Sequence, residues 1–510
     1  MSELDTSVQL CIFDTSRGQS DGQELDKILF FYPSESPFSA QLSLIGLGEG
    51  IITFTKMFSP NAPCDIIDTE KRSHVFFQPE PDIWMILVIE KRKESGELGR
   101  TRALQAILME AHGLFTLFYG SIRALLLNSP SGDVARSCLQ AFLPDYISDV
   151  MTVKRLSMLS SHSGLQERGT IQMMALDRST ALEVQSVVDL LQSWFGSGRI
   201  HHTLLLFQDL LVSTTLPPED AAHLYTYARM RLIPAAISTS SGGHSLKKVL
   251  SRANSSSVHL KASASDITAA GQRPSPADSS NHHSQFFTPR PLQHDKWWRD
   301  NDGFLVTDAW GVDAQGMSAI TPTVWLQQSS QERMKLVAYQ HKQLTVVMLI
   351  SVMHLAPNAD GSHVLRNQVL EKASNKLNAL EDRLSKEWGG INANHVPGYR
   401  YLYVDYDSRV SKASPAGKIA TLTKDSLLSL DKVRSEIDIA KGRCDGSGEA
   451  QPYELETCVR TRSNAWVVVR IRGNHELYLV LERASETLLL TAEATEKFSR
   501  RHCDGIFASD

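Results

Sequence analysis

The sequence predicts an α/β fold of the layered α+β kind, made of three similar units that each contain a five-stranded, mostly antiparallel sheet flanked by helices. Three observations lead to this prediction. With 510 residues the chain is too long for one hydrophobic core, and about three domains are expected. The order strand, strand, helix, three strands, helix recurs three times. Each repeat contains a long apolar run, at 82–90, 344–352 and 475–482.

The first unit is expected to span residues 1–160. Short apolar strands at 8–14 and 27–33 are separated by a turn rich in Gly and Asp, which is typical of a hairpin. A Ser-Pro pair then begins a helix that runs to about residue 58. Its apolar stripe is wide, so we expect this helix to pack on two sides. The unit continues with strands at 73–78 and 82–90 and helices at about 100–127 and 135–158.

Residues 161–200 are interpreted as a connector that contains a helix, and residues 201–390 as the second unit. Strands at 202–207 and 210–215 flank a Gln-Asp turn, and a helix follows. Residues 238–285 are dominated by Ser, Ala, Gly, His and Pro, so they cannot bury enough apolar surface and are expected to form a disordered insert. The unit resumes with strands at 303–307, 321–326, 334–339 and 344–352 and a helix at 364–388.

The third unit is expected to span residues 391–510. It repeats the same order of elements, with an Asp-Ser turn in its first hairpin and cations at the end of its last helix, where they suit the helix dipole. Its strands are expected at 399–405, 453–459, 465–471 and 475–482, and its main helix at about 425–440.

Composition limits the classes of function. A formal net charge of -5 and a pI near 6.4 argue against a chain built to bind nucleic acid. The six cysteines are scattered without a CxxC pair, which favours a reducing compartment over a zinc site or a disulfide framework. The N-terminus lacks the apolar core of a signal peptide, and no apolar run reaches the ~20 residues of a membrane span. Membrane contact is therefore expected to be peripheral, through a partner or a surface patch.

Familiar catalytic motifs are absent from the sequence, which has no HExxH, GxSxG or GxxxxGK[ST] pattern. We therefore predict no catalytic residue, no cofactor and no metal. The glycine-rich run Gly46–Gly50 lies inside an apolar helix and is interpreted as a close-packing or partner-docking segment, not a phosphate cradle. The pairs His201-His202 and His282-His283 lack ligands at metal spacing. Trp297-Trp298 is interpreted as the cover of a core where a loop re-enters a domain.

The serine-rich insert contains two candidate phosphorylation sites. Ser255 follows a basic residue at the spacing typical of basophilic kinases, and Ser275 precedes a proline. A phosphate would add charge that can switch docking.

The order of elements in each unit is that of the longin-type fold. The segments 10–14, 24–33 and 81–85 resemble the plant calcium-caffeine-zinc sensitivity family, the Ccz subunits of the Mon–Ccz vacuolar fusion complex. The segments 211–216 and 224–227 are similar to the second longin domain of that family. The resemblance covers nearly the whole chain, although other tri-longin subunits share the architecture.

The resemblance implies a subunit of a guanine nucleotide exchange factor without covalent catalysis. In this family a Mon-type longin protein is the partner, and the first longin domains of both subunits form the docking platform for a late-endosomal Rab GTPase of the Rab-seven type. The implied role is endosome maturation and the fusion of endosomes and autophagosomes with the vacuole or lysosome. It further implies a cytoplasmic protein recruited peripherally to late endosomal, prevacuolar and vacuolar membranes.

An exchange surface needs apolar and backbone complementarity, because the factor acts by binding the nucleotide-free GTPase more tightly. The candidate residues for GTPase or partner binding are Leu44, Leu47, Gly48 and Ile51 on the glycine-containing helix. The alternative is that both faces of this helix are internal core. A tri-longin adaptor or tether without exchange activity remains the rival function, and an enzyme would require a cleft with perturbed titratable groups.

Overall fold

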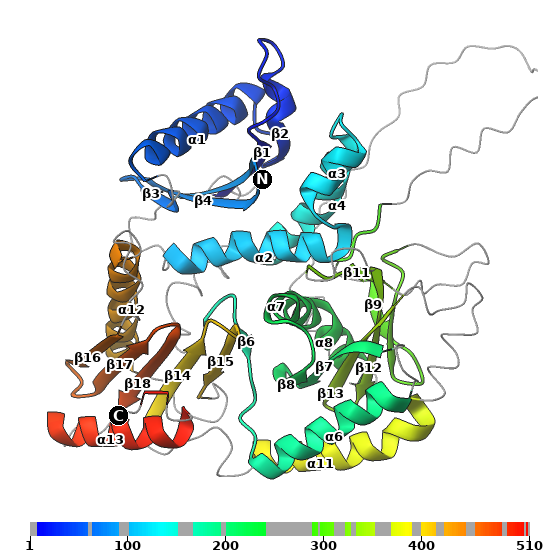
Figure 1. Cartoon of the computed structure of the whole chain (residues 1–510), viewed down its shortest axis with the longest axis vertical. Coiled ribbons are helices and arrows are strands. Elements are labelled where there is room, and N and C mark those ends of the chain that lie inside the picture. The colour runs from blue at the N-terminus through cyan, green and yellow to red at the C-terminus, as the bar shows by residue number, and fades with distance from the viewer. Residues whose placement is uncertain are drawn as a thin grey trace, which may run out of the picture.

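The computed structural model describes fifteen stretches of the chain. These are residues 8–59, 64–90, 101–150, 167–194, 200–240, 288–293, 296–310, 322–327, 333–351, 369–389, 399–414, 423–444, 454–481, 487–503 and 506–507. They contain three sheets with helices on their faces, which confirms the predicted fold class (Figure 1).

The first sheet has five strands, the number expected, in the order β2-β1-β5-β4-β3, and its short edge strand β3 was not among the segments predicted. Helix α1 covers one face, and α2, α3 and α4 lie on the other. The elements are β1 (Val8–Asp14), β2 (Ile28–Tyr32), α1 (Phe38–Phe58), β3 (Ile66–Asp68), β4 (Arg72–Glu80), β5 (Ile83–Glu90), α2 (Thr101–Tyr119), α3 (Ile122–Asn128) and α4 (Asp133–Val150).

Alternation along β1 explains why this sheet is covered on both sides. Leu10 and Ile12 point into the core shared with α2 and α4, whereas Cys11 and Phe13 point into the core beneath α1. Successive strand residues face opposite sides of a sheet. The central strand β5 is likewise apolar on both faces, so one sheet supports two separate cores.

The helix predicted at 100–127 is interrupted. Gly120 adopts a φ of +80°, which ends α2, and α3 begins two residues later. Both oxygens of Glu80 accept hydrogen bonds at the start of α3, from the backbone N–H groups of Ile122 at 2.8 Å and Arg123 at 2.7 Å. Burial opposes ionisation of Glu80, but bonds from His112 and these N–H groups outweigh it and lower its pKa.

The second sheet has seven strands, in the order β8-β7-β13-β12-β10-β9 with β11 beside β12. That is more than the five expected of each unit, and six of the seven were predicted as strand segments from the sequence. The one strand not predicted is β9, a short strand between the insert and β10. The elements are β7 (Ile200–Phe207), β8 (Leu210–Thr214), α7 (Pro218–Tyr227), a π-helical turn (Ala228–Leu232), α8 (Ile233–Ser240), β9 (Trp297–Arg299), β10 (Phe304–Thr307), β11 (Thr323–Trp325), β12 (Arg333–His341), β13 (Leu344–Ser351), a second π-helical turn (Val369–Ala373) and α11 (Ser374–Gly389).

The third sheet has six strands, in the order β16-β17-β18-β14-β15-β6. Helix α12 covers one face and α13 the other. Its elements are β14 (Tyr399–Asp405), β15 (Val410–Ala413), α12 (Lys424–Cys444), β16 (Glu454–Arg460), β17 (Trp466–Arg472), β18 (His475–Leu481) and α13 (Leu488–His502). The sixth strand, β6 (Ile171–Gln172), comes from the predicted connector and runs parallel to β15.

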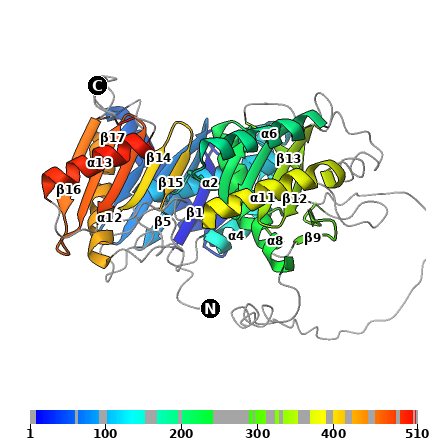
Figure 2. The same ribbon diagram turned by 90° about the horizontal axis from the view of Figure 1, so that it is seen from below.

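The connector ties the second and third sheets together. The N–H of Met173 donates to the carbonyl of Ser411, and the N–H of Met174 donates to that of Leu211, both at 2.8 Å. After β6, α6 (Arg178–Trp194) packs with α11 on the second sheet. Figure 2 shows α6, α11 and α13 on the same face of the two sheets.

Helix α2 lies between the first sheet and the other two domains (Figure 1). One continuous core joins the first sheet to α2, α4, α7 and the second sheet. Its aromatic centre includes Phe118, whose ring lies 4.6 Å from that of Tyr227. Trp297 is buried and donates to the Tyr227 hydroxyl at 2.8 Å, which confirms that this tryptophan covers a core.

Residues 241–285 of the predicted insert, with Ser255, Ser275 and the pair at 282–283, lie outside the described residues. Residues 238–240 were expected to belong to the insert but form the end of α8. Among the helices described, none combines the length and the apolar character that crossing a bilayer requires.

Candidate docking face of the first domain

Helix α1 turns a row of large apolar side chains away from its sheet. The exposed fractions are 65% for Phe38, 50% for Leu47, 62% for Phe54, 76% for Met57 and 74% for Phe58. Single exposed apolar residues are ordinary, but several on one helix face mark a binding surface. Phe38 is the first residue of the helix, nine positions before Leu47 and therefore on its opposite side. We call the face formed by Leu47, Phe54, Met57 and Phe58 the α1 outer face.

The spacing of these residues makes the outer face continuous. Leu47, Phe54 and Phe58 are separated by seven and four positions, so they lie along one side of an α-helix. Gly50 lies between them, and a Cβ placed there would meet nothing within 4 Å. The Phe54 and Phe58 rings are 5.0 Å apart. The result is an aromatic pair beside a point where another backbone can approach closely.

The structure separates the four candidate residues of this helix. Leu47 lies on the outer face. Leu44 and Ile51 are partly buried and pack against the core beneath α1. Gly48 faces the sheet, where an added Cβ would lie 2.4 Å from the Ile86 side chain, so its absent side chain lets α1 sit close to β5. A direct contact with a partner is therefore open to Leu47, and the binding role of the four residues remains a prediction.

Three residues of the outer face were not selected from the sequence as binding residues: Phe54, Met57 and Phe58. The signal was present, because the apolar stripe of α1 is wider than one sheet needs. Sequence alone does not show which side of that stripe faces the sheet. The buried set, Gln41, Ile45, Gly48 and Ile52, shows it.

Charges flank the outer face without crossing it. The Lys27 ammonium contacts both oxygens of Glu49 at 2.9 Å, which fixes the turn before β2 to the middle of α1. Lys56 lies 5.5 Å from the ring centre of buried Trp84. Partial burial of these charges leaves an apolar strip with a polar border, the usual anatomy of a protein interface.

An open groove of about 940 Å³ adjoins the start of α1. Its walls come from β2, α1 and α4, and Phe38, the first residue of α1, is one of its lining residues. β2 is an edge strand of the first sheet, so part of its backbone is available to a further strand. Arg136 and Arg290 line the same groove, where Arg136 donates to backbone carbonyls and Arg290 to the Asp145 carboxylate.

Chemistry at the outer face is limited to contact. No nucleophile or acid–base pair lies among its residues, and the nearest buried thiol, Cys11, has its pKa raised by burial. Elsewhere in the described residues, ligand atoms of Asp405, Asp407 and His475 lie within 4.8 Å of one another. His475 and Asp407 already bond to Tyr403 and Asn474, so hydrogen bonds account for this cluster.

Comparison with known proteins gives the family. Residues 8–120 match the model of the first longin domain of INTU, CCZ1 and HPS4, and residues 200–378 match the Intu longin-like domain 2. The chain is 46% identical to the vacuolar fusion protein CCZ1 homolog A of Arabidopsis thaliana, over 100% of this chain and 99% of the relative. The chain belongs to the CCZ1 family of vacuolar fusion proteins.

Two further relatives show the breadth of the match. The CCZ1 homolog of Oryza sativa subsp. japonica is 46% identical, with 98% of each chain covered. The homolog of Nematostella vectensis is 25% identical over 99% of this chain and 98% of its own. These matches confirm the predicted resemblance to the plant Ccz proteins, and the longin models confirm the fold class.

Proposed function

We propose that this chain is one subunit of a heterodimeric guanine nucleotide exchange factor, with a Mon-type longin protein as its partner. Its target is a late-endosomal Rab GTPase of the Rab-seven type. The complex promotes endosome maturation and the fusion of endosomes and autophagosomes with the vacuole. The observation that carries this proposal is the α1 outer face, an apolar surface on the domain that matches the first longin domain of CCZ1.

The geometry favours a shared surface. The opposite face of the first sheet is covered by α2 and the second domain, which leaves α1 and the groove beside β2 for other chains. A platform made by two subunits would hold the GTPase switch region in an open form. The nucleotide binds the closed form of the switch region and the exchange factor binds the open form. Each therefore weakens the binding of the other to the GTPase.

The remaining domains have a supporting role in this proposal. The second and third sheets are joined through β6 and the residue after it, so these two domains would support the first domain as one unit. Peripheral contact with late endosomal or vacuolar membranes would place the platform near its membrane-bound GTPase. Phosphorylation of the insert at Ser255 or Ser275 would modulate docking by adding negative charge.

The test is release of a fluorescent nucleotide from the Rab GTPase by the chain together with its Mon-type partner. We expect release by the complex and none by either subunit alone. Equal release by the isolated chain would contradict the shared platform. Binding of the GTPase without release would favour the rival function, a tri-longin adaptor or tether.

Variants of the outer face sharpen this test. Replacing Phe54 and Phe58 together with serine should lower the release rate at least about thirtyfold, because buried aromatic anchors contribute about 2 kcal/mol or more to an interface. The matched control is Leu182→Ser, which removes a similarly exposed leucine from α6. An undiminished rate in the double variant would exclude the outer face from the site.

A further inference from the structure

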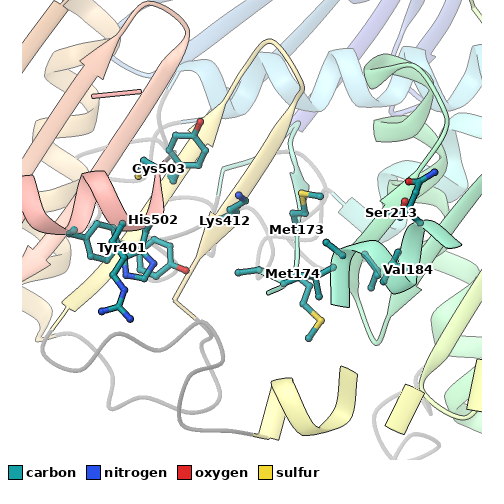
Figure 3. Close-up of a pocket in the computed structure, with 16 residues that line it drawn as sticks. Met173, Met174, Val184, Ser213, Tyr401, Lys412, His502 and Cys503 are labelled. Atoms are coloured by element: carbon teal, nitrogen blue, oxygen red, sulfur yellow. The ribbon is translucent and has the colours of Figure 1, made fainter. Parts of the chain in front are cut away.

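A second cavity lies at the joint of the second and third domains. Its volume is about 440 Å³, within the usual range for small-molecule sites. Figure 3 shows Met173 and Met174 of the connector between Val184 and Ser213 on one side and Tyr401, Lys412 and His502 on the other. The walls therefore come from four segments that are distant in sequence: the connector with α6, β8, the hairpin of β14 and β15, and α13.

The lining of this cavity is about evenly polar and apolar, and its apolar side chains form what we call the floor. Met174, Val184, Val212, Tyr401 and Phe498 line it, and all five are buried in their own domains. The two methionine side chains are flexible and polarizable, which suits them to irregular apolar ligands. Apolar side chains beside polar ones suit an amphiphilic ligand that carries a hydrocarbon chain.

The rim of the cavity is basic. Lys412 and Arg501 line it together with His502, and no acidic residue lies among the described lining residues. Neither Lys412 nor Arg501 forms an ion pair within the described part of the chain. The next arginine, Arg500, differs, since it bonds to Glu496 at 2.7 Å. Burial, and then the charge of Arg501, lower the pKa of His502, so the two other cations provide the positive charge near neutral pH.

We propose that this cavity binds a single-chain lipid with an anionic head group, its hydrocarbon chain on the methionine and aromatic floor and its head between Lys412 and Arg501. Such a ligand touches the connector and both flanking domains at once. Its binding would therefore stabilise the joint beside β6, because a ligand specific to the assembled state shifts the equilibrium toward that state. The proposal does not depend on exchange activity.

The experiment measures binding of monomeric oleoyl lysophosphatidic acid to the full chain by calorimetry, below its critical micelle concentration. Two matched probes separate the contributions of its hydrocarbon chain and its phosphate. Monoolein has the hydrocarbon chain without the charge, and glycerol 3-phosphate has the charge without the hydrocarbon chain. We expect each to bind at least tenfold more weakly. Equal binding of monoolein would overturn the role of the cations, and absence of lysophosphatidic acid binding would overturn the site.

Substitutions locate the ligand. Arg501→Gln combined with Lys412→Gln should weaken binding at least tenfold without a change in melting temperature. Arg500→Gln is the control, because it neutralises the neighbouring position outside the cavity. Equal loss in both variants would indicate general attraction to a basic surface. Binding to phosphatidic acid vesicles but not to the monomeric lipid would likewise contradict an enclosed site.

Discussion

Helices α1 and α2 lie on opposite faces of the same sheet, yet their surroundings differ. Each contains a glycine at a close contact. Gly48 of α1 faces Ile86 of its own sheet, whereas Gly113 of α2 faces His223 on α7 of the second domain. The far side of α1 carries exposed aromatic residues, and α2 is covered on both sides. One face of the sheet thus packs through α2 against the second domain, and the helix on its other face leaves an apolar surface available to a partner.

The ion pairs on the α2 side of the sheet also differ from those on the α1 side. On the α2 side, Glu110 accepts hydrogen bonds from Arg168 at 2.9 Å and from the Tyr146 hydroxyl at 3.0 Å. Burial alone would lower the pKa of Arg168, but Glu110 and Tyr146 raise it above its usual value. On the α1 side, Glu49 pairs with Lys27, its one ionic partner among the described residues. Covered faces therefore rely on ionic networks whose loss is costly.

Glu110→Ala should give the largest effect on folding. It removes the carboxylate from a buried arginine, and breaking such a pair costs about 3 kcal/mol. The matched change on the free side, Glu49→Ala, should cost less than about 1 kcal/mol. Hydrogen exchange of the α2 amides measures the first cost, and exchange of the α1 amides measures the second. Similar costs would show that the two faces are not energetically distinct.

Gly113→Ala should lower the free energy of unfolding by about 2 kcal/mol, because the new methyl would lie 2.0 Å from the His223 ring. Gly46→Ala is the control on α1. It meets nothing within 4 Å and should stabilise the helix by up to about 1 kcal/mol. Opposite signs are expected in urea denaturation. A neutral Gly113 variant would mean that α2 and α7 separate easily.

Acid should weaken the covered side through His223. Its burial, with the nearby charges of Arg409 and His112, lowers its pKa to about 4. The unfolded chain binds a proton near pH 6.5 and the folded chain near 4, so this group's contribution is intact above 6.5 and is lost as pH falls toward 4. In urea midpoints measured by tryptophan fluorescence, His223→Gln should flatten this decline. An unchanged pH slope would contradict the assignment.

The sequence was sufficient for the layered fold because each unit repeats the same order of strands and helices. It was less informative where short strands add to a sheet. The three residues of β9 carry too little periodicity for prediction, and the two residues of β6 pair only because the connector passes beside β15. Such pairings depend on tertiary placement and not on local pattern.

The candidate docking residues were placed on a helix that carries an exposed apolar face, but they could not be assigned to one side of it from the sequence. Leu47 and Gly48 are adjacent, and their side chains differ by about 100° around the helix axis. Only packing against Ile86 shows that Gly48 is the inner residue. The exposed Phe54, Met57 and Phe58 became candidates once that direction was known.

The most direct test of the central claim is hydroxyl-radical footprinting of the chain alone and with its Mon-type partner. Met57 on α1 and Met109 on α2 serve as paired probes, because both are exposed in the single chain. We predict that the partner protects Met57, Phe54 and Phe58 and leaves the oxidation of Met109 unchanged. Unprotected α1 residues in a stable complex would contradict the assignment of the α1 outer face as the docking surface.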